Sequence, residues 1–248
     1  MRFAYSLFDW GFIMEKLNPL GGNIKIYSND DYRFGTDGIL LSAFSAPKRH
    51  DRVIDLGSGG GIIPLLWCRK PREGETYALE IQKAACDLMK KSVEVSQVSD
   101  KIKILNMDMK EIETLKMGGR FDLVTCNPPY RVCGGGILNE SDARMIARHE
   151  VMCDISDVCT AAAHLLKTGG RVCICSRPER LSDVICALRE CGCEPKKLRF
   201  VAARCGAEPW LFLVEGKRGA SRGMRVLPTL YMEENGEVSA EIKEIYGM

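Results

Sequence analysis

The residues best suited to chemistry are Asn127, Pro128, Pro129 and Tyr130, which follow the apolar run 121–126. Two successive prolines remove two backbone donors and fix φ twice, so this segment is stiff. The Asn127 side-chain oxygen and the Pro128 carbonyl can each accept a hydrogen from an exocyclic amino group, while Tyr130 stacks on its ring. Such an amine attacks as a neutral group and needs no general base. The structural alternative is a proline-stiffened surface turn.

The elements around this segment predict an α/β sheet. The apolar run before Asn127 indicates a buried strand, and open α/β sheets bind ligands beyond the carboxyl ends of their strands. Another strand, 53–56, leads into the glycine loop, residues 57–61, and then into a helix from Ile62. A dinucleotide fingerprint would need glycine at position 62. Glycine at 57, 59 and 61 after an acidic strand residue is typical of methyltransferases.

Three acidic residues, Asp55, Glu80 and Asp108, lie at or near the ends of successive predicted strands. Glu80 follows the glycine loop by about twenty residues, the distance at which ribose hydroxyls are bound in this architecture. In the methyltransferase pattern, whose cofactor contains a methionine group, Asp55 would orient the loop and the ammonium of that methionine. Asp108 would accept from an adenine amino group, with Met107 and Met109 flanking the ring. The repetition over three β–α units favours a cofactor that contains a nucleoside.

Composition excludes several classes of site. The chain has 248 residues and a net charge of +2, so any nucleic-acid surface must be local. Its twelve cysteines include no C-x-x-C pair and only three histidines accompany them, so we expect reduced, buried thiols and no metal. No apolar stretch is long enough for a transmembrane helix. We expect a cytoplasmic protein without a membrane or metal partner.

The chain is divided into an N-terminal extension, 1–23, of uncertain order and a single domain, 24–248. A helix is predicted over 155–168, closed by Gly169 and Gly170. Strands at 197–203 and 210–215 would form a final antiparallel pair. The tail is expected to be helical near residues 240–246.

Two polar regions have two interpretations each. Residues 131–148 form either a mobile active-site flap or a spacer. The Gly/Ser/Arg loop 216–223 suits phosphate contacts, although a solvated loop has the same composition. The basic residues predicted to bind substrate, together with Tyr130, are Arg131, Arg148, Lys217, Arg218 and Arg222.

The chain resembles the bacterial tRNA1(Val) adenine-N6 methyltransferase family, a group of class I methyltransferases. The resemblance covers roughly residues 24–248 and rests on segments 32–37, 55–61 and 127–130, supported by 147–150, 177–181 and 208–209. It implies a Rossmann-like α/β fold, with a seven-stranded, mostly parallel sheet, one antiparallel strand and helices on both faces.

The resemblance also implies methyl transfer from S-adenosyl-L-methionine, the cofactor, to the N6 amino group of an adenine in the anticodon loop of a tRNA, the partner. The flipped base from this single-stranded loop would be held at Asn127. Phe34 would pack near the methionine portion, and Asp37 would shape that pocket. The chain would be a monomer or a weak homodimer. The full predicted cofactor site is Phe34, Thr36, Asp37, Asp55, Gly57, Ser58, Gly59, Gly61, Glu80, Ile81, Asp108, Met109 and Asn127.

The acceptor stays open at this stage. A guanine-N2 RNA methyltransferase also acts on an exocyclic amine, and a protein glutamine-N5 methyltransferase uses the same tetrapeptide on an amide. Glutamine-N5 methyltransferases typically have a separate helical N-terminal domain. The residues before the glycine loop are too few to form one. An RNA-binding protein that retains the fold without activity is the non-enzymatic alternative.

Overall fold

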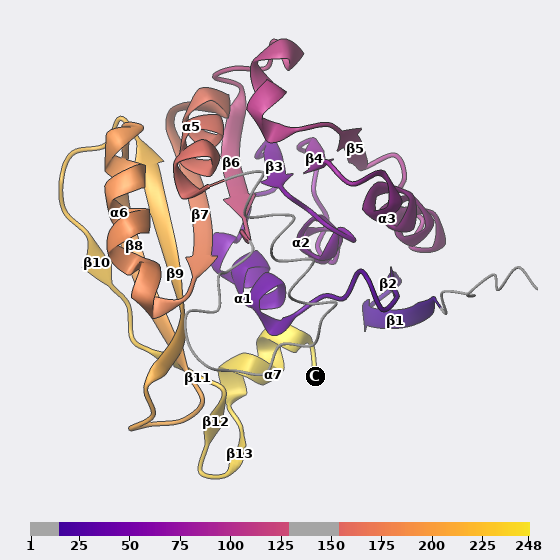
Figure 1. Ribbon diagram of the computed structural model, residues 1–248. Helices are drawn as coiled ribbons and strands as arrows, with labels where there is room; N and C mark the ends of the chain where they lie inside the picture. Colours follow the sequence, from indigo (N-terminus) through magenta and orange to yellow (C-terminus); the bar gives the residue numbers. More distant parts are fainter. Residues whose placement is uncertain (1–14, 129–153) are drawn as a thin grey trace, which may run out of the picture.

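A nine-stranded sheet is the centre of the computed structural model, which describes residues 15–128 and 154–248 (Figure 1). Its strands are β3 (Val53–Leu56), β4 (Thr76–Glu80), β5 (Ile102–Asn106), β6 (Phe121–Cys126), β7 (Leu166–Ser176), β8 (Cys193–Ala202), β9 (Pro209–Arg218), β10 (Arg225–Val226) and β11 (Leu230–Tyr231). Their order is β10-β8-β9-β7-β6-β3-β4-β5, and β11 also pairs with β8. Strand β9 runs antiparallel to both of its neighbours. The predicted α/β fold is confirmed, with two short strands added to the expected seven.

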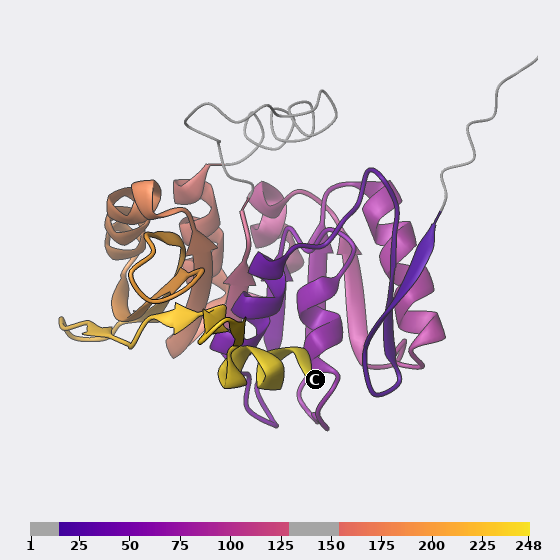
Figure 2. The ribbon, with the colours of Figure 1, turned by 90° about the horizontal axis from the view of Figure 1, so that it is seen from below.

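Helices lie on both faces of the sheet, as the view from below shows (Figure 2). The helical elements are α1 (Thr36–Ser45), α2 (Ile62–Trp67), α3 (Lys83–Val95), α5 (Ile155–Leu165), α6 (Leu181–Glu190), α7 (Ala240–Tyr246) and the 3-10 helices η1 (Met109–Leu115) and η2 (Pro178–Arg180). Alternate strand residues enter two separate cores. Val53 and Leu123 pack with α1, α2 and α3, whereas Ile54 and Val124 pack with α5 and α6. Burial on both faces explains why these strands read as continuous apolar runs.

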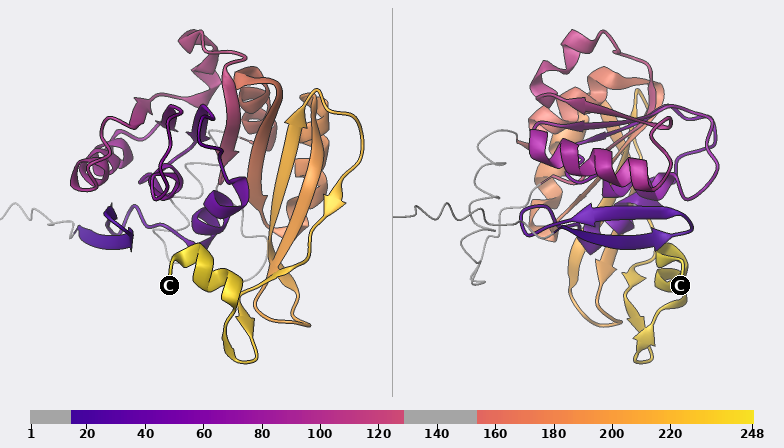
Figure 3. Two further views of the ribbon diagram at one scale, coloured as in Figure 1. Left: turned by 180° about the vertical axis from the view of Figure 1, so that it is seen from behind. Right: turned by 90° about the vertical axis from the view of Figure 1, so that its right-hand side faces the viewer.

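Two hairpins flank the sheet. Strands β1 (Lys16–Gly21) and β2 (Ile24–Ser28) pair with each other and lie beside α3 (Figure 3). The hydroxyls of Ser92 on α3 and of Ser96, its C-cap, accept hydrogen bonds from the backbone of β2, each at 2.9 Å. Residues 16–21, assigned to the extension by sequence, therefore form a strand. The second hairpin, β12 (Glu233–Glu234) and β13 (Glu237–Val238), precedes α7.

Long-range pairing moves one boundary that local sequence predicted. Helix α5 ends at Leu165, not at residue 168, because Leu166 already pairs with Phe121 on β6. Helix α1 has Gly35 as its N-cap, and no side chain caps it. The predicted antiparallel pair and the helix over 240–246 are confirmed.

Candidate active site

Most of the predicted cofactor residues lie where β3, β4, β5, β6 and β7 end, here called the carboxyl edge of the sheet. The register pairs Leu56 with Cys126 and with Leu79, so the segments that follow these strands emerge side by side. The opposite edge, where the same strands begin, is the amino edge. Open α/β sheets bind ligands at the carboxyl edge.

The glycine loop has a backbone that only glycine adopts without strain. Gly57, Gly59 and Gly61 have φ values of +67°, +53° and +88°. A Cβ at Gly61 would lie 2.6 Å from Cγ of Met89 on α3, so this glycine permits close packing. A Cβ at Gly59 would meet no atom within 4 Å. The loop therefore packs tightly on the α3 side and presents bare backbone at Gly59.

Glu80 holds the glycine loop at the end of β4. Its side chain is only 2% exposed. One carboxylate oxygen accepts the N–H of Gly59 and the other accepts the N–H of Gln82, both at 2.8 Å. A carboxylate offers about four acceptor positions, so these two bonds leave capacity for two hydroxyl donors. That donor–acceptor arrangement fits a ribose beside Gly59.

Asp55 lies deeper, one residue before the end of β3, and is 1% exposed. Burial raises the pKa of its carboxyl to about 7, although hydrogen bonds from the side chains of Thr125 and Ser58 oppose the shift. The Thr125 hydroxyl on β6 donates to Asp55 Oδ1 at 2.6 Å. Asp55 thus joins two neighbouring strands, and burial disfavours the charged form of its carboxyl. An ammonium group nearby would favour its ionised form.

Asp108 lies two residues beyond β5 and caps η1, where Oδ1 accepts from the N–H of Lys110 at 2.9 Å. Met109 opens η1 and its Cε would lie 3.9 Å from a Cβ at Gly57. The Asn106 amide donates to the carbonyls of Glu80 and Ile81, each at 2.9 Å. These contacts bring the ends of β4 and β5 and the glycine loop into one region.

Residues 29–35, here called the cover segment, are bonded to the same region. The Asn29 side chain accepts the N–H groups of Asp31 and Tyr32 at 3.1 and 2.8 Å, which closes a tight turn. The Tyr32 hydroxyl then donates to Gln82 Oε1 at 2.8 Å. Because Gln82 also donates to Glu80, the cover segment is joined through two hydrogen bonds to the carboxylate that holds Gly59.

The cover segment leads into α1, and the two together contain three predicted cofactor residues, Phe34, Thr36 and Asp37. Phe34 is half-buried against the first core, and Asp37 lies in the first turn of α1. Thr36 Oγ1 lies 3.4 Å from the Tyr246 hydroxyl, within hydrogen-bonding distance of α7. A cavity of about 360 Å³ opens beside Phe34. It is lined by Lys16, Asn18, Ser28, Asn29, Asp30, Arg33 and Phe34.

Asn127 and Pro128 follow β6 directly, both half-buried. Asn127 Oδ1 accepts a hydrogen bond from the Cys175 thiol on β7, with sulfur and oxygen 3.1 Å apart. Predictions for Pro129, Tyr130, Arg131 and Arg148 lie outside the described residues.

Three predicted substrate residues are not brought together with Asn127. Lys217 pairs in register with Arg171, which belongs to the first half of β7, so Lys217 and Arg218 lie toward the amino edge. Arg222 follows in the loop between β9 and β10. The turn that does reach the carboxyl edge is 203–208, which contains Arg204.

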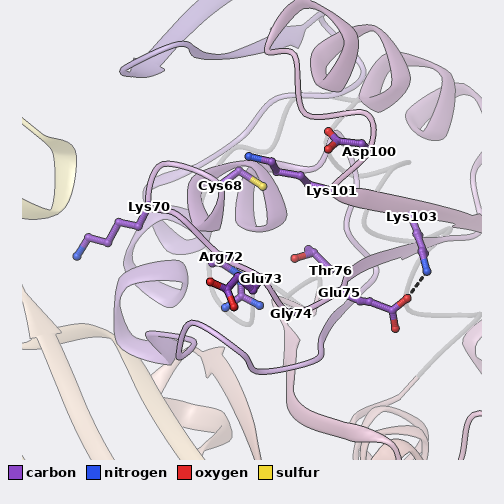
Figure 4. A pocket seen from close by; sticks show the side chains of 10 residues that line it. All are labelled: Cys68, Lys70, Arg72, Glu73, Gly74, Glu75, Thr76, Asp100, Lys101 and Lys103. Carbon is purple, nitrogen blue, oxygen red and sulfur yellow. Dashed lines mark hydrogen bonds and ion pairs between the residues drawn. The ribbon is translucent and has the colours of Figure 1, made fainter.

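A further cavity, of about 250 Å³, lies at the amino edge (Figure 4). Basic and acidic side chains mix along its wall, and Lys103 is paired with Glu75. It contains none of the predicted site residues. Its lining is Cys68, Lys70, Arg72, Glu73, Gly74, Glu75, Thr76, Asp100, Lys101 and Lys103.

Sequence reasoning missed Gln82, Asn106, Thr125 and Cys175. Each acts through a partner from a different strand or loop, and no spacing rule joins them. Of these four residues, Gln82 is the one that the sequence could have indicated, because it follows Glu80, the acidic end of β4, by two residues.

Within residues 15–128 and 154–248, no group of three or more His, Cys, Asp or Glu side chains is placed to hold a metal ion. In the same ranges, no helix combines the length and apolarity that crossing a bilayer requires. The described cysteines are all free thiols, most of them buried, with Cys186 and Cys205 exposed.

Proteins with similar sequences are named as methyltransferases. The chain is 27% identical over 191 residues to the tRNA1(Val) (adenine(37)-N6)-methyltransferase of Aeromonas hydrophila, with 77% of this chain and 78% of that protein covered. It is 30% identical over 159 residues to the protein of the same name from Porphyromonas gingivalis, with 61% of each chain covered.

Solved structures share the fold. A protein described as a predicted O-methyltransferase from Agrobacterium tumefaciens superposes with a TM-score of 0.69 at 20% identity, over 86% of this chain and 96% of that one. An S-adenosylmethionine-dependent O-methyltransferase from Thermotoga maritima gives 0.54 at 14% identity, over 77% and 68%.

The family described as the methyltransferase small domain matches residues 21–183, a stretch that includes the glycine loop, Glu80, Asp108 and Asn127. The match covers more than half of the chain. This protein therefore belongs to the methyltransferase small domain family.

Proposed function

We propose that this protein transfers a methyl group from S-adenosyl-L-methionine to an exocyclic amine of an RNA base, namely N6 of an adenine in a tRNA. The observation that carries the proposal is the position of Asn127. It follows β6 at the carboxyl edge, on the strand next to β3 and its glycine loop. The relatives named tRNA1(Val) (adenine(37)-N6)-methyltransferase support this acceptor.

The residues present fit the cofactor. Gly59 offers bare backbone, and Glu80 beside it retains acceptor capacity for two ribose hydroxyls. Asp55 supplies a buried carboxylate for the ammonium group of the methionine portion. We assign the adenine to Asp108, Ile81 and Met109, which follow the ends of β4 and β5. When bound, S-adenosyl-L-methionine supplies an electrophilic methyl group on a positively charged sulfur.

The chain's own contribution to the reaction is orientation. Asn127 Oδ1 and the Pro128 carbonyl accept the two hydrogens of the target amine, which directs the nitrogen lone pair toward the methyl group. Acceptors at these hydrogens also stabilise the positive charge that develops on nitrogen during attack. An adenine reaches this position only out of its stack, so the proposed acceptor is a flipped base in a single-stranded loop.

Methyl transfer from radiolabelled S-adenosyl-L-methionine to bulk tRNA lacking the native modification tests the proposal. We expect label in N6-methyladenosine after digestion to nucleosides. Label in N2-methylguanosine would identify guanine as the acceptor base, and label in a protein fraction would indicate a glutamine amide as the acceptor. Absence of label from every fraction, despite cofactor binding, would contradict the proposed reaction.

A further inference from the structure

Cys175 lies beside Asn127, on the strand next to the one that carries it. Strands β6 and β7 are parallel, and Cys126 pairs with Ile174. This register brings the residues just after that pair, Asn127 and Cys175, next to each other. The Cys175 sulfur is 3.1 Å from Asn127 Oδ1, and its side chain is 0% exposed. The thiol therefore donates to the amide oxygen from the protein interior.

This hydrogen bond bears on the rotation of the Asn127 amide. The terminal torsion of an asparagine side chain has broad minima, so packing alone does not fix which way its oxygen points. A target amine is a hydrogen-bond donor and requires the oxygen, whereas a reversed amide would present N–H groups to it. An amide oxygen can accept two hydrogen bonds, so accepting from Cys175 is compatible with accepting from the amine.

We propose that Cys175 is a positioning residue for methyl transfer, whose thiol holds the amide oxygen of Asn127 toward the reacting amine. The inference rests on the proposed function of Asn127. The role assigned to Cys175 is exerted through its hydrogen bond to Asn127. Burial in apolar surroundings keeps such a thiol unreactive, so it serves as a neutral donor and not as a nucleophile.

The chain supplies a matched control in Cys173. Cys173 and Cys175 lie two residues apart on β7, so their side chains point to the same face of the sheet. Both are 0% exposed and belong to the same core cluster. Cys173, however, lies two residues further from the carboxyl edge, where it pairs with Thr125 and not with Asn127. A change at Cys173 therefore reproduces the packing cost without touching Asn127.

The test compares Cys175→Ser, Cys175→Val, Cys175→Ala and Cys173→Ala by single-turnover methylation of unmodified tRNA. We expect Cys175→Ala to lower the rate about 3- to 10-fold, the effect of one hydrogen bond, with cofactor Kd and RNA KM unchanged. Cys175→Ser restores most of the rate because serine keeps a donor, whereas Cys175→Val keeps the volume and stays slow. Cys173→Ala retains the wild-type rate.

A role in packing alone predicts the reverse order, since valine suits a buried apolar site and serine places a hydroxyl there. A Cys175→Val rate equal to wild type, with Cys175→Ser slow, would overturn the inference. Should the valine variant not fold, equal rates for Cys175→Ala and Cys173→Ala would overturn it as well. In both cases wild type still methylates RNA, so the proposed function survives. If wild type methylates no RNA, the proposed function fails and the role of Cys175 fails with it.

Discussion

Single residues at the carboxyl edge divide into those proposed to hold the cofactor and those proposed to hold the acceptor. Glu80 and Asp55 are almost fully buried and are bonded to the glycine loop or to β6. Asn127 is half-buried at the end of the next strand. Because different elements carry the two tasks, substitutions should separate cofactor affinity from turnover.

Asn127→Ala is expected to lower turnover on tRNA by roughly a hundredfold or more, the usual effect of removing one preorganised polar group from a transition state. Cofactor affinity measured by calorimetry should stay close to that of wild type, because the glycine loop and Glu80 are unchanged. A large loss of cofactor binding would refute the assignment of Asn127 to the acceptor.

Asp55→Asn is expected to change how stability depends on pH. The folded state raises the pKa of Asp55 to about 7 from an ordinary value of 3.8, so folding favours the neutral carboxyl. Its contribution to stability is therefore fully present below pH 3.8 and is lost as pH rises through 7.

The free energy of unfolding of the asparagine variant minus that of wild type should increase from pH 5 to pH 8, by an amount on the order of a few kcal/mol. Asparagine keeps an oxygen for the Thr125 hydroxyl, so the comparison isolates the charge. Urea denaturation at both pH values measures the difference, and a difference independent of pH would contradict the assigned pKa.

At the level of elements, the site depends on connections between strand ends. The cover segment reaches the glycine loop through Tyr32, Gln82 and Glu80, each link 2.8 Å long. Tyr32 and Gln82 are 50 residues apart in sequence. The Tyr32 hydroxyl thus links the cover segment to the residues that hold the glycine loop.

Tyr32→Phe removes that hydroxyl and little else. We expect cofactor Kd to rise about 3- to 10-fold, because the cover segment loses one hydrogen bond to the region it covers. Tyr231→Phe, on β11 and away from the glycine loop, is the matched control and should bind like wild type. Equal affinities for the two variants would show that Tyr32 acts by packing.

Local sequence signals predicted the elements better than the contacts between them. The glycine pattern located the loop between β3 and α2, and its glycines at 57, 59 and 61 have positive φ values, a conformation that glycine adopts without strain. The end of α5 was misplaced because Leu166 belongs to a strand pairing with Phe121. Likewise, Cys175 and Asn127 meet across 48 residues of chain, a proximity that only strand order and register create.

Across the whole molecule, the charged surfaces are arranged differently from the sequence-based expectation. The basic loop 216–223 lies at the amino edge, whereas the acidic hairpin β12–β13 follows β11 at the end of β8 that belongs to the carboxyl edge. Arg204, in the exposed turn after β8, is a basic residue that does lie at this edge. We expect RNA phosphates to approach from this turn, away from the acidic hairpin.

Arg204→Ala should raise the KM for tRNA and reduce its salt dependence by about one phosphate contact, without changing cofactor Kd. Arg222→Ala, which removes an exposed arginine from the loop near the amino edge, serves as control and should leave both quantities unchanged. A larger KM effect from Arg222 would mean that the RNA extends around the sheet to its amino edge.

Strand β8 is ten residues long, and among the described residues two short strands pair with its outer side: β10 at Lys197 and Leu198, and β11 at Val201 and Ala202. An uncovered strand of this length would expose unpaired N–H and C=O groups that can template aggregation. We therefore expect residues 225–231 to limit self-assembly, apart from any part in catalysis. A chain ending at residue 224 should form large particles at concentrations where the full chain scatters little light.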